Sequence, residues 1–191
     1  MLVLQYLAVP FEEKDEAKSL GAKWSQSEKV WYVPEGLNPE DFDKWIPEFT
    51  KNKIDITEKP SEHTKVFWLF ASAPKNTDKQ DTEHSGKWLL FIRRVFIDQA
   101  WAVIKKATKE GRLTKAAKVS TALENPNAKD NIDHVICVYT YDCTDEADVK
   151  NVREKLRELG FTKKMPYKSD QATFSGRYSN KGDTNISMYY E

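Results

Sequence analysis

Hydrophobic and polar positions follow two different patterns along the chain, and the first covers residues 1–50. The elements expected there are a strand, a short helix, a hairpin and a second helix, over residues 2–8, 11–21, 22–34 and 39–46. Gly21 stands where the end of a helix needs a left-handed residue. Asn38 followed by Pro39 is typical of a helix start. We therefore expect a small α+β module rich in aromatic residues over residues 1–50.

The second pattern covers residues 64–191, after a polar stretch over 51–63 that we interpret as a linker. The expected strands are 65–74, 87–92, 116–123 and 134–142, and the expected helices are 98–111 and 144–160. Residues 65–74 are apolar on both faces, which predicts a central strand. Thr144 is the expected cap of the last helix. The order of elements predicts an α+β domain: a curved antiparallel sheet with its helices on one face.

The parity of side chains along two of these strands predicts what the other sheet face presents. In one strand Ala117 and Val119 alternate with Lys118 and Ser120, and in the other Ile136 and Val138 alternate with Tyr139 and Tyr141. The aliphatic set suits a helix-covered face. The second set, a lysine, a hydroxyl and two phenols, suits an anionic or aromatic ligand. Parity leaves open the alternative that the lysine is solvated and the tyrosines pack beneath the C-terminal tail.

The composition is consistent with these expectations but does not indicate an activity. The chain has 191 residues, 39% hydrophobic and 31% charged, with a formal net charge of zero, as in globular proteins. Residues 1–60 carry 8 basic and 12 acidic side chains, and residues 61–191 carry 22 and 18. This basic excess is too small for a general DNA-binding surface. Cys137 and Cys143 lie about 20 Å apart on one expected strand, so we expect free thiols and a cytoplasmic location.

Residues 9–34, "VPFEEKDEAKSLGAKWSQSEKVWYVP", resemble a small domain of unknown function found near the start of plasmid primases and other mobile-element proteins. The resemblance implies a mobile-element setting. Trp24, Trp31 and Tyr32 are its most prominent residues. They are either the core of a small module or a surface on which bases stack, next to Lys23 and Lys29.

Six blocks in residues 64–191 resemble a second family, labelled phosphothreonine lyase domain proteins, which includes the basophilic-leukaemia-expressed protein of animals. The blocks are "SGKWLLFI", "AKVSTAL", "VICVYTYD", "DVKNVREKLRELG", "PYKSD" and "GRYS". The family is similar in fold to the cap-binding translation initiation factor. The resemblance therefore implies a curved antiparallel sheet backed by helices.

A phosphothreonine lyase needs a base, a general acid and cations that hold phosphate. Lys118 is the candidate catalytic base, Lys87 and Lys168 are alternative bases or phosphate contacts, and Arg177 is the candidate phosphate fork. No histidine is identified as the general acid. His63, His84 and His134 do not occupy positions in the matched blocks that would suit this role. The residues therefore favour an anion pocket over elimination.

The sequence thus predicts a two-domain protein that binds a phosphorylated ligand on the open sheet face. The expected ligand-binding residues are Lys87, Lys118, Ser120, Tyr139, Tyr141, Lys168 and Arg177. The expected partner is a phosphorylated small molecule or a nucleic acid, without a membrane, metal or cofactor. Asp142, Asp145 and Asp148 are interpreted as capping charges. A lyase-like enzyme with a lysine base and an interaction module without a small-molecule site are the alternatives.

Overall fold

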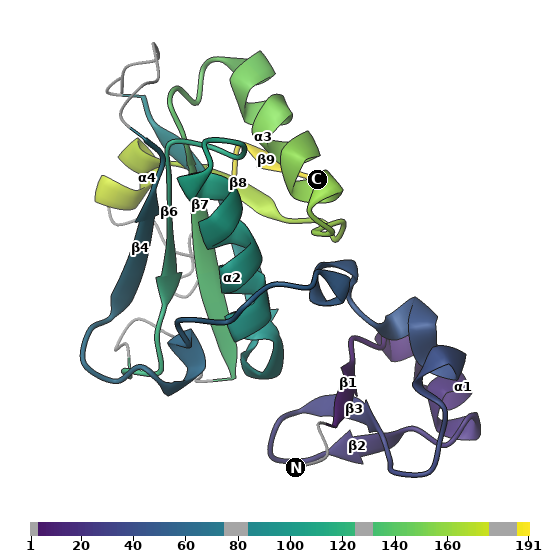
Figure 1. Cartoon of the computed structure of the whole chain (residues 1–191). Helices are drawn as coiled ribbons and strands as arrows, with labels where there is room; N and C mark the ends of the chain where they lie inside the picture. The colour runs from purple at the N-terminus through teal and green to yellow at the C-terminus, as the bar shows by residue number, and fades with distance from the viewer. Residues whose placement is uncertain (1–3, 75–83, 125–131, 176–186) are drawn as a thin grey trace. The chain divides into compact units, whose positions relative to one another are not determined.

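The structure is a computed structural model that describes residues 4–74, 84–124, 132–175 and 187–191. The chain divides into two compact units, Met1–Lys53 and Ile54–Glu191. Figure 1 labels the elements of both units. Within the described residues, no helix is long and apolar enough to cross a membrane.

The N-terminal unit is a three-stranded antiparallel sheet, in the order β1-β3-β2, with short helices. Its elements are β1 (Gln5–Leu7), η1 (Phe11–Glu13), α1 (Lys14–Ser19), β2 (Lys23–Ser25), β3 (Val30–Val33), η2 (Pro39–Trp45) and η3 (Glu48–Lys51). The second predicted helix is a 3-10 helix, and the Asn38 side chain accepts a hydrogen bond from the amide of Glu40 at 3.2 Å at its start. Gly21 follows α1 with a φ of 98°, so its predicted role at the helix end is confirmed.

A small hydrophobic cluster holds the N-terminal unit together. Its buried members are Leu7, Ala17, Ala22, Val33, Phe42 and Trp45, and Trp31 packs against them. The indole of Trp45 donates a hydrogen bond to Glu13 Oε2 at 2.8 Å, which ties η2 to η1. Because the strands are only three or four residues long, side chains from the helices supply much of this core.

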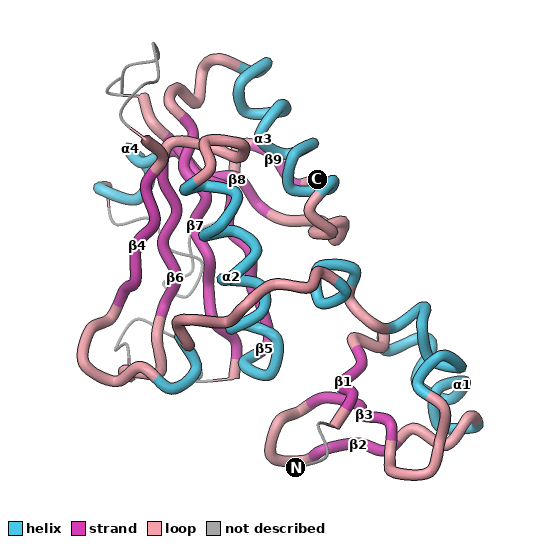
Figure 2. The backbone as a smooth tube through the Cα atoms, viewed as in Figure 1, coloured by secondary structure: helices cyan, strands magenta, loops and turns pink. Residues whose placement is uncertain are grey.

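The C-terminal unit is a six-stranded antiparallel sheet in the order β4-β6-β7-β5-β8-β9. Its elements are η4 (Pro60–Glu62), β4 (Trp68–Ser72), β5 (Gly86–Arg93), α2 (Arg94–Lys109), β6 (Ala116–Ser120), β7 (Asp133–Thr140), α3 (Glu146–Glu158), β8 (Pro166–Ser169), α4 (Asp170–Phe174) and β9 (Tyr189–Tyr190). Figure 2 shows α2 running along the strands of this sheet. The predicted α+β class with an antiparallel sheet is confirmed.

The two long helices cover one face of the large sheet. The register pairs Ala117 with Val138 and Val119 with Ile136, and all four side chains are fully buried. Helix α2 packs on β4, β5, β6 and β7, whereas α3 contacts β7. The indole of Trp88, also on this face, donates a hydrogen bond to the carbonyl of Val149 in α3 at 3.1 Å. The alternating aliphatic side chains of β6 and β7 therefore lie on the helix-covered face, as their parity predicted.

Two local predictions about this unit are wrong. Strand β4 lies at the edge of the sheet, next to β6 alone, and not at its centre. Its second apolar face is not buried, since Phe70 is 67% exposed. Helix α3 is capped by Asp145, whose Oδ1 accepts from the Asp148 amide at 3.1 Å, and not by Thr144. Where a strand is apolar on both faces, as β4 is, the pattern does not show which face the fold covers.

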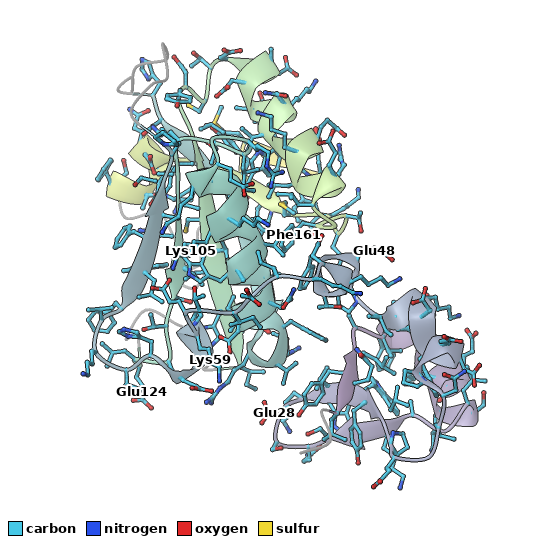
Figure 3. All side chains as sticks on the ribbon, in the orientation of Figure 1. Glu28, Glu48, Lys59, Lys105, Glu124 and Phe161 are labelled. Atoms are coloured by element: carbon cyan, nitrogen blue, oxygen red, sulfur yellow. The ribbon has the colours of Figure 1, made fainter. Side chains whose placement is uncertain are left out.

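The polar segment interpreted as a linker is attached to α2 over its second half. Glu58 Oε2 accepts hydrogen bonds from the Trp101 indole at 2.7 Å and from Lys105 Nζ at 2.9 Å. Ser61 donates through its amide and hydroxyl to the Asp98 carboxylate at 2.9 and 2.6 Å. Figure 3 labels Lys105 on α2. The segment therefore belongs to the C-terminal unit, which begins at Ile54, and Glu58 and Ser61 attach it to α2.

Candidate ligand-binding face

The sheet of the C-terminal unit has a second face, opposite α2, on which polar and aromatic side chains gather. The cross-strand register aligns Phe70, Lys118, Cys137 and Leu89 in one row, and Tyr139, Lys87 and Lys168 in another. We call this surface the open face. The side chains that define it are Trp68, Phe70, Lys87, Phe91, Lys118, Ser120, Cys137, Tyr139 and Lys168.

Lys118 lies among aromatic rings of the open face. Its Nζ is 4.2 Å from the centre of the Trp68 ring and 5.9 Å from the centre of the Tyr139 ring. Phe70 is its direct neighbour across the strands. The ion pairs within the described part of the chain do not include Lys118. Aromatic ring faces attract a cation without neutralising it, so the Lys118 ammonium can still contact an anion.

Lys87, in contrast, is buried and paired. Its Nζ forms an ion pair with Asp170 at the start of α4, and the hydroxyl of Ser85 donates to the other carboxylate oxygen at 2.6 Å. Burial acts to raise the pKa of Asp170, but the hydrogen bonds from Lys87 and Ser85 and the charge of Lys115 outweigh it and lower that pKa. The carboxylate thus stays ionised and holds Lys87 in place.

Two further groups of the open face keep their protons at neutral pH. Burial raises the pKa of the Cys137 thiol to about 11, despite the nearby charges of Lys118 and Lys87. Burial also raises the pKa of the Tyr139 phenol well above its ordinary value. The Tyr139 ring lies between two lysines, with Lys87 Nζ at 5.5 Å from its centre. A buried thiol of this kind is a poor nucleophile.

The structure brings together some of the predicted binding residues and separates others. Lys118, Tyr139 and Lys87 are neighbours, and Lys168 is the cross-strand partner of Lys87. The Ser120 hydroxyl accepts a hydrogen bond from the Val135 amide at 2.9 Å, so it holds two strands together. Tyr141 lies beyond the end of β7, with Lys115 Nζ at 5.3 Å from its ring centre. Arg177 lies outside the described residues.

The histidines do not supply the missing general acid. His134 is buried on the helix-covered face, where its Nδ1 lies 3.0 Å from the carbonyl oxygen of Ser120. Burial lowers its pKa, although that hydrogen bond acts in the opposite direction. His63 follows η4, in the segment attached to α2, and His84 is exposed just before β5. The arrangement therefore holds cations and aromatic rings without a histidine among them.

Sequence reasoning missed the most exposed aromatic residues of the open face. Phe70 on β4 is 67% exposed and Phe91 on β5 is 62% exposed, and Trp68 contacts Lys118. It also missed Asp170, the partner of Lys87. Parity could have placed Trp68 and Phe70 on one face, but their strand was expected to be buried on both sides.

The aromatic residues of the N-terminal unit do not form one platform. Trp24 and Trp31 are cross-strand partners on the face that carries Leu7, and their rings meet edge to face with centres 5.6 Å apart. Tyr32 lies on the opposite face, between Tyr6 and Lys23 in the register. Trp31 packs against the core. A base-stacking surface made of both tryptophans and Tyr32 is thus not assembled by this sheet.

Side chains that can ligate a metal are dispersed among the residues that the structure describes. Within them, no group of three or more His, Cys, Asp or Glu side chains could hold a metal ion. Both cysteines are free. The open face instead offers ammonium groups, aromatic rings and a buried carboxylate that is already paired.

Comparison with known proteins gives two matches, one in each unit. A family model described as basophilic leukemia-expressed protein Bles03 matches residues 58–175, and a model described as domain of unknown function (DUF5710) matches residues 5–47. The N-terminal region is similar to two proteins named DNA primase TraC from Escherichia coli. One is 58% identical over 43 residues, which are 22% of this chain and 4% of the relative. The other is 56% identical over 41 residues, 22% of this chain and 3% of the relative.

Proposed function

The chain belongs to the family of the basophilic leukemia-expressed protein Bles03, and we propose that its open face binds a phosphorylated ligand. The observation that carries the proposal is the position of Lys118. Its ammonium group faces the Trp68 and Tyr139 rings and has no carboxylate partner in the described part of the chain. In this arrangement Lys118 contacts the phosphate, and the neighbouring rings contact the rest of the ligand.

The geometry favours binding over the lyase alternative. Elimination needs an uncharged base and a proton donor beside it. Lys87 is already engaged in an ion pair with Asp170, and the Lys118 Nζ lies against the Trp68 ring. His134 lies on the other face. These observations support a binding role in which Lys118 contacts the ligand and Lys87 stays paired with Asp170.

The similarity of the N-terminal unit supports a ligand that contains a nucleotide. The relatives in that comparison are named DNA primases, and this chain spans only 4% and 3% of their lengths. A nucleotide or nucleic-acid end supplies both a phosphate and an aromatic base, which match the two kinds of side chain on the open face. A mobile-element setting and, from the two free cysteines, a reducing compartment such as the cytoplasm are part of this proposal.

The test is the thermal midpoint of the protein with AMP, a dinucleotide, a cap analogue, inorganic phosphate and a phosphothreonine peptide. A ligand present at 100 times its dissociation constant stabilises the folded protein by about 2.7 kcal/mol, which a melting curve resolves. We expect AMP or the dinucleotide to raise the midpoint. We expect Lys118→Ala to abolish that rise, because the phosphate loses its cation.

The matched control is Lys106→Ala, since Lys106 is an exposed lysine on α2, the helix that covers the other face. This variant should keep the full rise in midpoint. If the rise in thermal midpoint persists in Lys118→Ala, the ligand binds at another site. No rise with any compound would contradict the proposal and leave an interaction module as the better explanation of the open face.

A further inference from the structure

The open face carries two strongly exposed aromatic side chains on separate strands. Phe70 on β4 is 67% exposed and Phe91 on β5 is 62% exposed. The register places Phe70 in the row of Lys118, and Phe91 two residues further along β5 from Leu89, which lies in that same row. Folding does not bury these rings, although burial of a phenylalanine side chain is favourable. Both rings lie on the side opposite α2, where a ligand can reach them.

The distance between the two rings exceeds the size of one nucleotide base. In the sheet order β4-β6-β7-β5 the strands of Phe70 and Phe91 lie three spacings apart, or roughly 14 Å across the sheet, and Phe91 is offset by two more residues along β5. A single base therefore stacks on one ring and leaves the other exposed. A ligand that covers both must present aromatic groups in succession along an extended chain.

Positive charge lies between and around the two rings. The charged side chains that parity places on this face of the strands are Lys87, Arg93, Lys118, Lys168 and Asp133. Asp133 is paired with Arg93 at 3.3 Å, and Asp170 from α4 is paired with Lys87. Lys118 lies outside these two ion pairs, against the Trp68 and Tyr139 rings. A chain of phosphates is complementary to this surface.

From these observations we propose that the open face binds a single-stranded polynucleotide, with bases of non-adjacent nucleotides stacked on Phe70 and Phe91 and a phosphate at Lys118. This inference rests on the proposed function and names its ligand class. Bases of a single strand are free to stack on side chains, whereas those of a duplex are already stacked on one another. A protein partner fits less well, because lysine is depleted from the centre of protein interfaces and Lys118 lies beside Phe70.

The test is fluorescence anisotropy with labelled 12-nucleotide dT and rU strands on the full chain. A dT duplex with dA, unlabelled AMP and inorganic phosphate are the competitors. We expect Phe70→Leu and Phe91→Leu each to weaken single-strand binding about tenfold, the loss expected for one stacked base. Lys118→Ala should also weaken it and reduce its salt dependence. The dT and rU strands distinguish DNA from RNA as the source of the polynucleotide.

The matched control is Phe11→Leu. Phe11 is 75% exposed in the N-terminal unit and lies against Lys14, with Nζ 3.6 Å from the ring centre. Phe11 and Lys14 thus provide an exposed ring next to a lysine outside the open face. Phe11→Leu should therefore leave single-strand binding unchanged. An equal loss in Phe11→Leu would mean that exposed rings bind nucleic acid without a defined site, which contradicts the inference.

The remaining outcomes separate this inference from the proposed function. One outcome is that AMP binds through Lys118 while the single strands bind no tighter than AMP and Phe91→Leu has no effect. That result would contradict the inference of a polynucleotide ligand but would support the phosphate site at Lys118. If neither AMP nor any strand binds, both proposals are wrong. Tighter binding of the duplex, or self-association that sedimentation detects and Phe91→Leu abolishes, would assign the open face to duplex DNA or to a second copy of the chain.

Discussion

Single residues of the same type differ on the open face according to their partners. Lys87 on β5 and Lys118 on β6 lie on the same sheet face, on either side of β7, and both approach the Tyr139 ring. Lys87 is buried against Asp170, whereas Lys118 is half-buried against Trp68. The first lysine therefore stabilises the fold, and the second is available to a ligand. The sequence proposed both as phosphate contacts, because residue type alone does not reveal a carboxylate that arrives from a distant part of the chain.

We expect Asp170→Asn to lower the free energy of unfolding by about 3 kcal/mol at pH 7, because it leaves the buried Lys87 ammonium without its counter-charge. The pKa of Asp170 is lowered in the folded state, so the ionised form stabilises the fold above the unfolded pKa of about 3.9. That contribution is lost as the pH falls through the folded pKa. The stability difference between the two proteins should therefore shrink below about pH 4. Urea unfolding of both proteins at pH 7, 5 and 3 measures it.

The control is Glu146→Gln, which breaks an exposed pair with Lys150 on α3. Exposed pairs of this kind contribute little to stability because solvent screens them. A double variant, Lys87→Met with Asp170→Leu, should cost less than Asp170→Asn alone, because it removes both charges. Equal losses in Asp170→Asn and Glu146→Gln would contradict the role given to the buried pair.

At the scale of elements, the helices and the inner strands were predictable, and the outer strand was not. The alternation in β6 and β7 correctly separated the covered face from the open face, because period-two patterns record burial directly. In β4 the apolar pattern led to the wrong prediction that both faces of the strand are buried. Its open side carries Trp68 and Phe70, which look like core residues in a sequence. Strands β8 and β9 contribute four and two residues, too few for a pattern to predict.

The junction of β5, β7 and β8 depends on a close contact at Gly86. A Cβ added there would lie against the hydroxyl of Tyr167 and 2.6 Å from its Cζ atom. That ring is fully buried, and its hydroxyl oxygen lies 2.5 Å from Thr140 Oγ1, so it has no room to move. We expect Gly86→Ala to cost about 1–3 kcal/mol, as overpacking does elsewhere. Denaturant unfolding measures the loss.

A comparison variant for this junction is Gly36→Ala, where an added Cβ meets no atom within 4 Å but the φ is 91°. That variant reports backbone strain without a steric contact. If Gly86→Ala were as stable as the unmodified protein, the close approach of β5 to Tyr167 would not limit the packing of the junction.

At the scale of the whole molecule, the chain joins two units whose cores are separate. The segment before β4 belongs to the second unit, because Glu58 and Ser61 bind Trp101, Lys105 and Asp98 of α2. The Bles03 family match also begins at residue 58. The polar composition of residues 51–63 led to their interpretation as a linker. Composition alone cannot distinguish a linker from a segment that hydrogen-bonds to a buried indole, because both contain the same residue types.

We therefore expect a fragment of residues 54–191 to be more stable than a fragment of residues 64–191. The shorter fragment leaves the fully buried Trp101 without its hydrogen-bond acceptor, at a cost of about 2 kcal/mol. Thermal melting of the two fragments compares them directly. Glu58→Gln in the longer fragment keeps an acceptor for the indole and should retain part of the difference. Identical midpoints for both fragments would show that the segment before β4 contributes nothing to this unit.

The sequence by itself determined the fold class, the family, both long helices and the two faces of the inner strands. These follow from local periodicity, from helix ends such as Gly21 and from blocks of matching residues, all of which are written along the chain. Only the tertiary structure decided that β4 is an edge strand with Phe70 exposed, that Asp170 binds Lys87, and that Trp24 is the cross-strand partner of Trp31. Those facts depend on which distant segments become neighbours. Sheet order and cross-strand register set these contacts, and no local pattern records them.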